Sequence, residues 1–434
     1  MSATQSASRN QRTPSATGAK GSASGTASGI AKWQRLLLFA ALGLVALSVT
    51  RSLSGQEVLT NSGTSQALLA LALPVGLAGL GGLVSERAGV VNIGLEGMMI
   101  LGCWFAGYAG YLWGPWGALA GALIGGALGG LLHAIATVTF GVDHIVSGVA
   151  INLLAAGAAR FLSELGYKNV AGGGPTQSPP MKGTIPTFDV PILAGGLDLL
   201  GKLERTHLVV VSDVAGLLRG LMLGVSPFQI LGVLMFPLVA FILWRTAFGL
   251  RLRSAGENPW AAESLGVNVI RAKFIAVIAS GALAGLGGLM LVLFSGIYKE
   301  GQTGGRGFIG LAAMIFGNWR PGGLASGALL FGYADAVRLR SQDSLAVLAL
   351  FLCAAIVITG IGIWWLRKGR RVGGAILIGT GVAFALGYFG LGSLPNEVTT
   401  VTPYIVTLAV LIVSSQNLRM PQADGAAYRR GEDH

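Results

Sequence analysis

Long apolar runs recur along this chain of 434 residues and constrain its fold more than any other feature. A run of about 18 or more apolar residues is long enough to cross a bilayer as a helix. Only 11% of the residues are charged, whereas about 25% are charged in ordinary soluble domains. The sequence therefore predicts an all-α fold, a polytopic bundle of transmembrane helices. Its ten candidate spans cover residues 36–50, 66–84, 92–113, 115–139, 144–163, 226–247, 273–296, 345–366, 373–392 and 398–415.

Two shorter apolar pieces, residues 308–319 and 322–337, lie between the candidate spans. The sequence Arg320-Pro321-Gly322 separates them, because proline and glycine both interrupt helices. The pieces form either a re-entrant pair or one short and one full span. In both cases the chain returns to the side of the membrane that it left.

The basic residues predict how the chain is oriented. Residues 1–35 are rich in Ser, Thr, Ala and Gly and contain five bases and no acid, which is typical of a disordered tail. Further basic clusters lie in 245–273 and 367–371, whereas the long loop 164–225 has five bases and five acids. Because Lys and Arg favour the cytoplasmic side, both termini, including the tail 416–434, are predicted to be cytoplasmic in a bacterial inner membrane. The net charge of +12 is thus a topology signal, and no nucleic-acid partner is expected.

An internal repeat links two distant parts of the chain. The sequence LAGLGGL occurs at residues 77–83 and again at 283–289, and IGLEGMMILG at 93–102 resembles IGLAAMIFG at 309–317. The predicted topology makes the two copies inverted in the membrane. Inverted repeats place a solute path near the bilayer midplane, beside broken helices. Residues 90–97 and 308–319 are therefore expected to flank such a path.

Several polar residues fall within or beside the apolar spans. A polar or charged group in a bilayer usually faces a cavity or a partner, and Asn92 and Glu96 share one face if their segment is helical. Ser147 and Asn152 allow the same two interpretations, which are hydrogen bonding to a neighbouring helix or lining of the solute path. Phe308, at the start of the second repeat segment, is assigned to the path as well. No phosphate-binding loop or metal-ligand spacing is present in the sequence, and no cofactor is expected.

The segment GENPWAAESLGVNV, residues 256–269, interrupts the apolar runs on the predicted cytoplasmic side. Asn258 is a helix-capping residue, Pro259 suits the first helical position, and Gly266 suits the end of a helix. The enclosed helix of two turns is too short to be stable alone. It must therefore rest on a partner or on the rest of its own chain. Ala261, Ala262 and Leu265 would give it a small, flat face.

This segment, within FGLRLRSAGENPWAAESLGVN, resembles the coupling helix of ABC importer permeases of the branched-chain amino acid and simple sugar type. GLVSERAGVVNIGLEGMM and HIVSGVAINLLA are similar to nucleoside ABC permeases. GFIGLAAMIFGNWRPGG and the C-terminal TPYIVTLAVLIVSSQNLRMPQADGAAYRRG match that pattern too. The resemblance covers about 66–340 and 395–430.

The resemblance implies a transmembrane permease domain over 36–415, with a coupling helix at about 256–268. It implies no chemistry by this chain itself, since a separate ABC ATPase subunit would hydrolyse ATP. A second permease subunit would complete the path, an external substrate-binding lipoprotein would deliver the solute, and membrane lipid would surround the helices. Carried over by position, the residues of the ATPase contact are Gly256, Glu257, Pro259, Ala261, Ala262 and Gly266.

Residues 341–394 depart from the family pattern, because two additional hydrophobic helices precede the final span. The resulting hypothesis is a nucleoside permease that works by alternating access. Simple sugars or branched-chain amino acids remain alternative solutes. An ion-coupled secondary transporter would need an ion site in the membrane, for which Asn92 with Glu96 is the candidate. A membrane enzyme would need a clustered set of reactive residues, which the sequence does not contain.

Overall fold

The computed structural model describes residues 32–341, 344–391 and 418–429, together with positions 395, 398, 401, 404, 405 and 408. The chain divides into two units, residues 1–41 and 42–434. In the first unit, the described residues 32–41 begin helix α1. The second unit contains all the features that follow.

The described residues form fourteen α-helices, one 3-10 helix and one π-helix, and contain no β-strand, which confirms the all-α fold. The first half of the chain contains α1 (Lys32–Ser54), η1 (Glu57–Leu59), α2 (Ser62–Arg87), α3 (Leu95–Ala134), η2 (Ile135–Thr139), α4 (His144–Tyr167), α5 (Leu199–Glu204) and α6 (Val211–Met222). The second half contains α7 (Pro227–Arg245), α8 (Ala247–Glu257), α9 (Pro259–Ser264), α10 (Val269–Ser295), α11 (Arg306–Phe316), α12 (Pro321–Arg340), α13 (Ser344–Arg367) and α14 (Arg371–Gly390).

Seven helices of the described chain are long and apolar enough to cross a membrane: α2, α3, α4, α7, α10, α13 and α14. With η2, the α3 run is 45 residues long, or about 68 Å, which is more than twice the hydrocarbon thickness of about 30 Å. Gly114 breaks this run with φ 75° and ψ −166°, immediately before Pro115. A Cβ on Gly121 would lie 2.4 Å from the carbonyl oxygen of Phe105, so the second half folds back on the first. The run is therefore a helical hairpin, in agreement with the two spans expected at 92–113 and 115–139.

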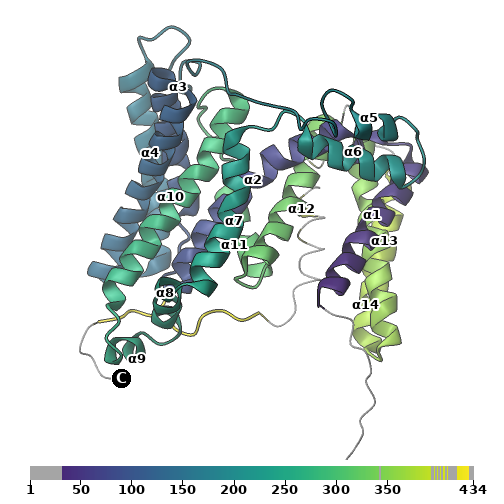
Figure 1. Cartoon of the computed structure of the whole chain (residues 1–434). Helices are drawn as coiled ribbons and strands as arrows, with labels where there is room; N and C mark the ends of the chain where they lie inside the picture. The colour runs from purple at the N-terminus through teal and green to yellow at the C-terminus, as the bar shows by residue number, and fades with distance from the viewer. Residues whose placement is uncertain are drawn as a thin grey trace, which may run out of the picture. The chain divides into compact units, whose positions relative to one another are not determined.

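Helices α2 and α10, which contain the two copies of LAGLGGL, pack against each other in antiparallel orientation (Figure 1). A Cβ on Gly81 would lie 2.5 Å from the carbonyl oxygen of Ser280, and one on Gly287 would lie 2.8 Å from that of Pro74. Small residues allow membrane helices to approach this closely. The inverted orientation expected for the repeat is thus present in the packing of its two central helices.

Each copy of the repeat also packs on the element that follows the other copy. Gly79 of α2 contacts the backbone of Gly310 in α11, and Gly285 of α10 contacts Ala122 and Gly102 in the two arms of α3. The pair α11–α12 thus occupies, relative to α2, the place that the α3 hairpin occupies relative to α10. Glycine at these positions is required for the close contacts, which explains why the motif is repeated.

The lengths of α11 and α12 bear on the two structures expected for residues 308–337, a re-entrant pair or one short and one full span. Helix α11 has 11 residues, or about 16 Å, and falls well short of crossing the bilayer. Helix α12 has 20 residues and runs antiparallel along α2, where Gly332 lies against Ala72 and Ala328 against Gly76. The segment is therefore a short helix followed by one of 20 residues. Because α12 is not among the seven helices apolar enough to cross a membrane, a full span there stays a prediction.

The two additional helices expected within 341–394 form the hairpin α13–α14. Gly374 contacts Gly362, and Gly381 contacts Thr359 across the pair. A separate apolar cluster joins α13 to Leu59 of η1 and Val337 of α12. The tenth expected span, 398–415, lies outside the described residues except for isolated positions.

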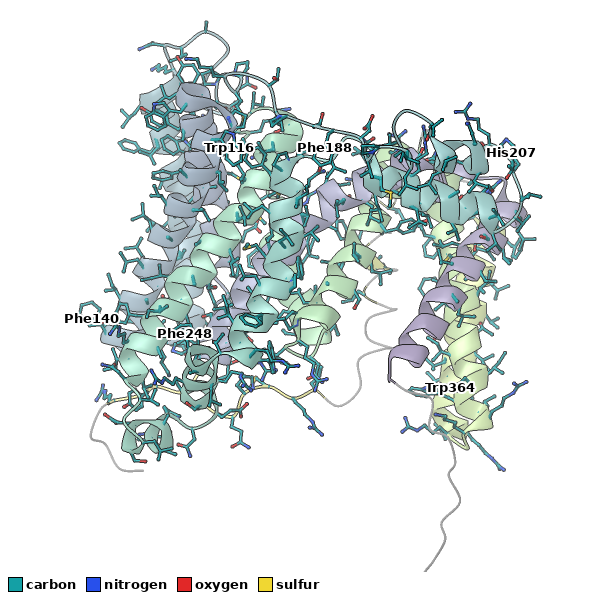
Figure 2. All side chains as sticks on the ribbon, viewed as in Figure 1. Trp116, Phe140, Phe188, His207, Phe248 and Trp364 are labelled. Carbon is teal, nitrogen blue, oxygen red and sulfur yellow. The ribbon has the colours of Figure 1, made fainter. Side chains whose placement is uncertain are left out.

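Opposite ends of the helices carry different elements (Figure 1). Helices α8 and α9 lie at the end where α7 stops and α10 starts, and α5 and α6 lie at the other end. Exposed aromatic side chains mark both ends, with Trp116 and Phe188 at the end that carries α5 and α6, and Phe140 and Phe248 at the end that carries α8 and α9 (Figure 2). Such aromatic belts are typical of the two membrane interfaces.

Charged residues of loop 164–225 pair with each other at the end that carries α5 and α6. Arg219 of α6 forms ion pairs with Asp198 (2.7 Å) and Glu204 (3.2 Å). Glu204 also accepts a hydrogen bond from the backbone N–H of Ser62, at the start of α2 (2.9 Å). The Arg219 guanidinium lowers the pKa of Asp198 below its usual value. These charges thus fasten α5 and α6 over the start of α2.

Candidate functional site

Glu96 lies where two helices begin. It is in the first turn of α3, and its carboxylate accepts hydrogen bonds from the backbone N–H groups of Gly305 (2.9 Å) and Gly307 (2.7 Å) at the start of α11. The first N–H groups of a helix lack partners within the helix and carry a partial positive charge. A Cβ on Gly307 would lie 2.5 Å from the backbone nitrogen of Glu96. One carboxylate therefore holds together the starts of α3 and α11, the two segments that the repeat relates.

Asn92 and Asn152 satisfy the irregular backbone before α3. Asn92 donates to the hydroxyl oxygen of Ser280 on α10 (2.9 Å) and accepts from the N–H of Gly94 (3.1 Å). Asn152 of α4 accepts from the N–H of Gly97 (2.7 Å) and donates to the carbonyl oxygen of Ile93 (3.1 Å). Helix α3 starts at Leu95, so Asn92 precedes the helix and shares no helix face with Glu96. The condition for a shared face, a helical segment from residue 92, is therefore not met, because the broken backbone extends to residue 94.

Ser147 belongs to a separate hydrogen-bonded group. Its hydroxyl lies 2.9 Å from Nδ1 of His133, and Nε2 of that ring lies 3.0 Å from the carbonyl oxygen of Val91. His144 accepts a hydrogen bond from the backbone N–H of Val91 (3.3 Å). Both histidines thus bond the segment before α3 to its neighbours.

The predicted path residues therefore fall into two groups. Asn92, Glu96, Ser147 and Asn152 bond to neighbouring segments, as the first of their two interpretations expected. Phe308 of α11 differs, because 46% of it is exposed. The assignment of all five to a solute path stays a prediction.

Sequence reasoning missed a buried charge cluster between α11 and α12. Arg306 forms an ion pair with Asp335 (2.8 Å), and Asp335 pairs with Arg338 on its own helix (2.9 Å). Asp335, a charge within the apolar piece 322–337, was the available signal, because charges in a membrane are usually paired. The cluster fixes the start of α11 against the middle of the bundle.

The segment 256–269 folds as its capping residues predict. Asn258 accepts a hydrogen bond from the N–H of Ala261 (3.0 Å), and Pro259 occupies the first position of α9. Gly266 has a φ of 83°, a left-handed conformation that suits glycine. Asn268 then caps α10 by accepting from the N–H of Arg271 (3.0 Å). Helix α8, which precedes α9, was not anticipated from the sequence.

The expected flat face of α9 is divided between the inside and the outside of the chain. Ala262 is 2% exposed and packs with Ala255 of α8 and Val269 of α10. Leu265 is 85% exposed, and Ala261 is exposed as well. The helix therefore rests on its own chain through Ala262 and presents Ala261 and Leu265 outward.

The segment 256–269 contacts the ends of other helices through Gly256 and Glu257. A Cβ on Gly256 would lie 2.3 Å from the carbonyl oxygen of Arg87, so only glycine fits there. The guanidinium of Arg87 lies 3.8 Å from the Glu257 carboxylate and donates to the carbonyl oxygen of Trp319 (2.8 Å). The segment thus contacts the end of α2 and, through Arg87, the turn between α11 and α12.

Residues 418–429, which we call the C-terminal strap, run across this same end of the molecule (Figure 1). The N–H of Ala423 donates to the carbonyl oxygen of Gly256 (3.0 Å), and the Tyr428 hydroxyl donates to the Glu263 carboxylate of α9 (2.5 Å). The N–H of Arg419 donates to the side chain of Asn318 in the α11–α12 turn (2.7 Å). The strap therefore bonds to α8, to α9 and to the turn between α11 and α12.

A buried carboxyl group anchors the middle of the strap. Burial and the neighbouring Glu86 carboxylate raise the pKa of Asp424 to about 9, while Lys273 acts in the opposite direction. Glu86 itself accepts a hydrogen bond from Nε1 of Trp319 (2.6 Å). At neutral pH the Asp424 carboxyl is thus mainly protonated.

Comparison with known proteins identifies the family. Residues 65–341 match the family described as "Branched-chain amino acid transport system / permease component". The chain belongs to this family. It is accordingly a multi-pass membrane permease component, and the match ends where the additional hairpin α13–α14 begins.

Similar permeases come from several organisms. The chain is 37% identical over 281 residues to the guanosine ABC transporter permease protein NupQ of Bacillus subtilis, which covers 63% of this chain and 81% of the relative. It is 33% identical over 371 residues to the nucleoside ABC transporter permease protein NupC of Lactococcus lactis, covering 83% and 95%. It is 34% identical over 273 residues to the putative glucose ABC transporter permease protein TsgC13 of Haloferax volcanii, covering 62% and 74%. No solved structure matches the chain.

Proposed function

We propose that the chain is the permease subunit of an ATP-driven importer that carries nucleosides across the bacterial inner membrane. ATP would be hydrolysed on a separate ABC ATPase subunit. A second permease subunit and an extracytoplasmic substrate-binding lipoprotein would complete the assembly. The similarity to NupQ and NupC supports the nucleoside as the solute.

One structural observation carries the mechanism. Helix α9 presents Ala261 and Leu265 outward, while its neighbours Gly256 and Glu257 contact the end of α2. Helix α10, the inverted partner of α2, starts at Val269, shortly after α9. An ATPase that moves α9 would therefore move both inverted halves, which is the motion that alternating access requires.

The experiment is reconstitution of the chain in proteoliposomes with its ATPase, second permease and binding lipoprotein. We expect uptake of tritiated uridine and guanosine only when ATP is supplied on the ATPase side. Uptake by this chain alone, driven by an ion gradient without ATP, would contradict the proposal and favour a secondary transporter.

A sugar importer is the second candidate, because TsgC13 is 34% identical to the chain. The two solute classes separate in a competition assay. Excess unlabelled uridine should abolish uptake of labelled uridine, whereas excess glucose or leucine should leave it unchanged. Loss of uptake with glucose instead would transfer the assignment to sugars.

A further inference from the structure

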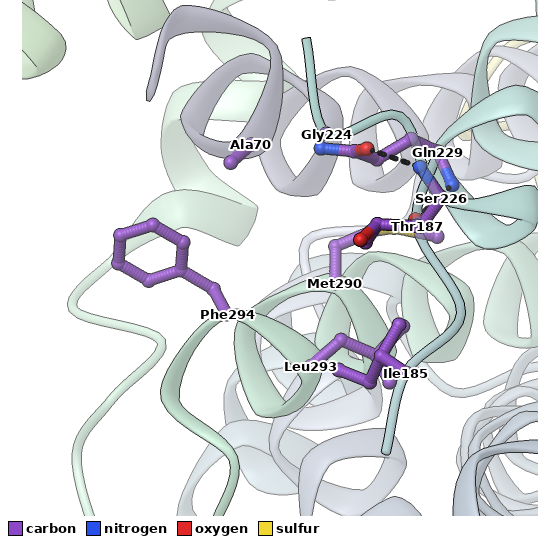
Figure 3. Close-up of a pocket in the computed structure, with 9 residues that line it drawn as sticks. All are labelled: Ala70, Ile185, Thr187, Gly224, Ser226, Gln229, Met290, Leu293 and Phe294. Carbon is purple, nitrogen blue, oxygen red and sulfur yellow. Dashed lines mark hydrogen bonds between the residues drawn. The ribbon is translucent and has the colours of Figure 1, made fainter. Parts of the chain in front are cut away.

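Cavities of about 510 and 440 Å³ lie beside the segment 256–269, the proposed ATPase contact. Two further cavities of more than 200 Å³ lie away from that segment, and their polar groups distinguish them. The first, of about 220 Å³, lies between α2, α7, α10 and the loop before α7 (Figure 3). Its polar groups bond locally, since the Ser226 N–H donates to the Gln229 side chain (2.9 Å) and the Gln229 N–H donates back to the Ser226 hydroxyl (3.2 Å). The remaining lining is mainly apolar, so this cavity offers little to a polar solute.

The second cavity, of about 270 Å³, lies between α3, α4 and the loop that connects α10 to α11. We call it the loop cavity. Ile100 and Ala156 give it apolar walls from α3 and α4, and Tyr298, Gln302 and Thr303 line it from the loop. A volume near the low end of ligand pockets, which range over about 300–1,000 Å³, suits one small molecule.

The loop cavity contains a hydrogen-bond donor that the described residues leave unused. The side-chain oxygen of Gln302 accepts from the N–H of Lys299 (3.1 Å), which folds the loop into a turn. Its Nε2 is buried and makes no standard hydrogen bond among the described residues, and the nearby acceptor in the lining is the weakly accepting sulfur of Cys103. Buried polar groups are normally paired, and an unpaired one costs free energy. The Gln302 amide is thus positioned to donate to a ligand.

The charges at this cavity are also informative. Glu300, at its edge, pairs with Arg160 of α4 (2.7 Å), and both side chains are partly exposed. Of the residues that line the cavity, Lys299 and Glu300 are charged, with opposite signs, and both are exposed. The lining thus has no net charge, which favours an uncharged solute with hydrogen-bonding groups and a flat apolar face.

We propose that the loop cavity binds the transported solute, an uncharged nucleoside, with Gln302 and Thr303 bonding its polar edge and Ile100 and Ala156 packing on its ring. This inference rests on the proposed function. The same loop continues to Gly305 and Gly307, which Glu96 caps at the start of α11. A solute bound in the cavity would thus affect the contact between the starts of α3 and α11, where the two inverted halves join.

The test uses the reconstituted importer and tritiated uridine. Thr303→Val keeps the shape of the side chain and removes its hydroxyl, so the KM for uridine should rise about tenfold while kcat changes less than twofold. Thr303→Ser should retain the wild-type KM. Ala156→Trp fills the cavity and should lower uptake at least tenfold, whereas Leu154→Trp, which is exposed on the same helix but does not line the cavity, should not.

Co-purification with the ATPase subunit reports whether each variant folds. If Ala156→Trp fails to assemble, Thr303→Val decides the question. Wild-type uptake with unchanged KM in Thr303→Val and unchanged uptake in an assembled Ala156→Trp would overturn the cavity assignment alone. Absence of uridine uptake by the wild-type importer would instead contradict the proposed function, and the nucleoside assignment of the cavity with it.

Discussion

At the residue scale, Glu96 caps α11, a helix that starts more than two hundred residues later in the chain. Its two oxygens take separate N–H groups, from Gly305 and Gly307. The surroundings are buried, so water has little access to replace the carboxylate. The side chain therefore stabilises the broken backbone at the centre of the molecule.

Replacing Glu96 by alanine should destabilise the protein because it leaves two buried N–H groups without acceptors. Each such group costs about 1–3 kcal/mol, so the free energy of unfolding should fall by about 2–6 kcal/mol. Glu96→Gln keeps one acceptor oxygen and should cost less. Thermal unfolding in detergent measures both, with the exposed Glu164→Ala as control. Equal unfolding temperatures for Glu96→Ala and wild type would contradict the capping role.

Asp424 predicts a pH dependence of the C-terminal strap. Its pKa is about 9 when the strap is docked and about 3.9 in an unfolded segment. The docked state binds the extra proton between these values, so docking should weaken progressively as the pH rises from about 4 to about 9. Glu86 promotes this effect, and Lys273 reduces it.

Limited proteolysis of the strap in detergent, followed at several pH values, measures the docking. The wild-type strap should be cleaved faster at pH 9 than at pH 6. Asp424→Asn, which is neutral throughout, should remove most of that difference, after correction for the protease's own pH profile with an unfolded substrate. A wild-type cleavage rate that is constant with pH would refute the prediction.

At the element scale, the two alanines of α9 should behave differently. Ala261 is exposed, so Ala261→Glu should leave folding intact and abolish ATP-driven uptake by disturbing the ATPase contact. Ala262 is buried against Ala255 and Val269, so Ala262→Glu should loosen α9 itself.

Co-purification with the ATPase and proteolysis within 256–268 distinguish these outcomes. Ala261→Glu should lose the ATPase and resist the protease, whereas Ala262→Glu should be cleaved. Full ATP-driven uptake by Ala261→Glu would remove α9 from the ATPase contact.

The same helix shows how far sequence reasoning extends. Asn258, Pro259 and Gly266 act on the backbone within a few residues, so the start and end of α9 could be predicted from their types. Which side of α9 is buried depends on Val269 and on Tyr428, whose partner Glu263 is 165 residues away in sequence. No local pattern encodes such a contact.

The helix pattern of the membrane part was predictable for a related reason. Apolar length alone defines a span, and Pro115 marked the break in α3. The start of α3 was harder to predict, because the backbone before it is held open by Asn152 from another helix. Likewise, α11 is short because its start is fixed by Glu96 and by the pair Arg306–Asp335.

At the scale of the whole molecule, both inverted halves contact the segment 256–269, which contains α9. Helix α2 ends at Arg87, which contacts Glu257 and the carbonyl oxygen of Trp319. Helix α10 begins just after α9, and the strap bonds to α9 and to the α11–α12 turn. The contacts form a continuous connection from the proposed ATPase surface to the end of α11.

The proposed orientation can be tested because the two ends of the molecule offer matched exposed leucines. Leu265 follows α9 and Leu208 lies between α5 and α6, and both are more than half exposed. Introduced singly into a chain in which Cys103 and Cys353 are replaced by alanine, Leu265→Cys and Leu208→Cys would be the only thiols. Because basic segments stay in the cytoplasm, a membrane-impermeant maleimide should label Leu265→Cys only in inside-out vesicles and Leu208→Cys only in right-side-out vesicles. The reverse pattern would place α9 outside the cell, where no ATPase could reach it.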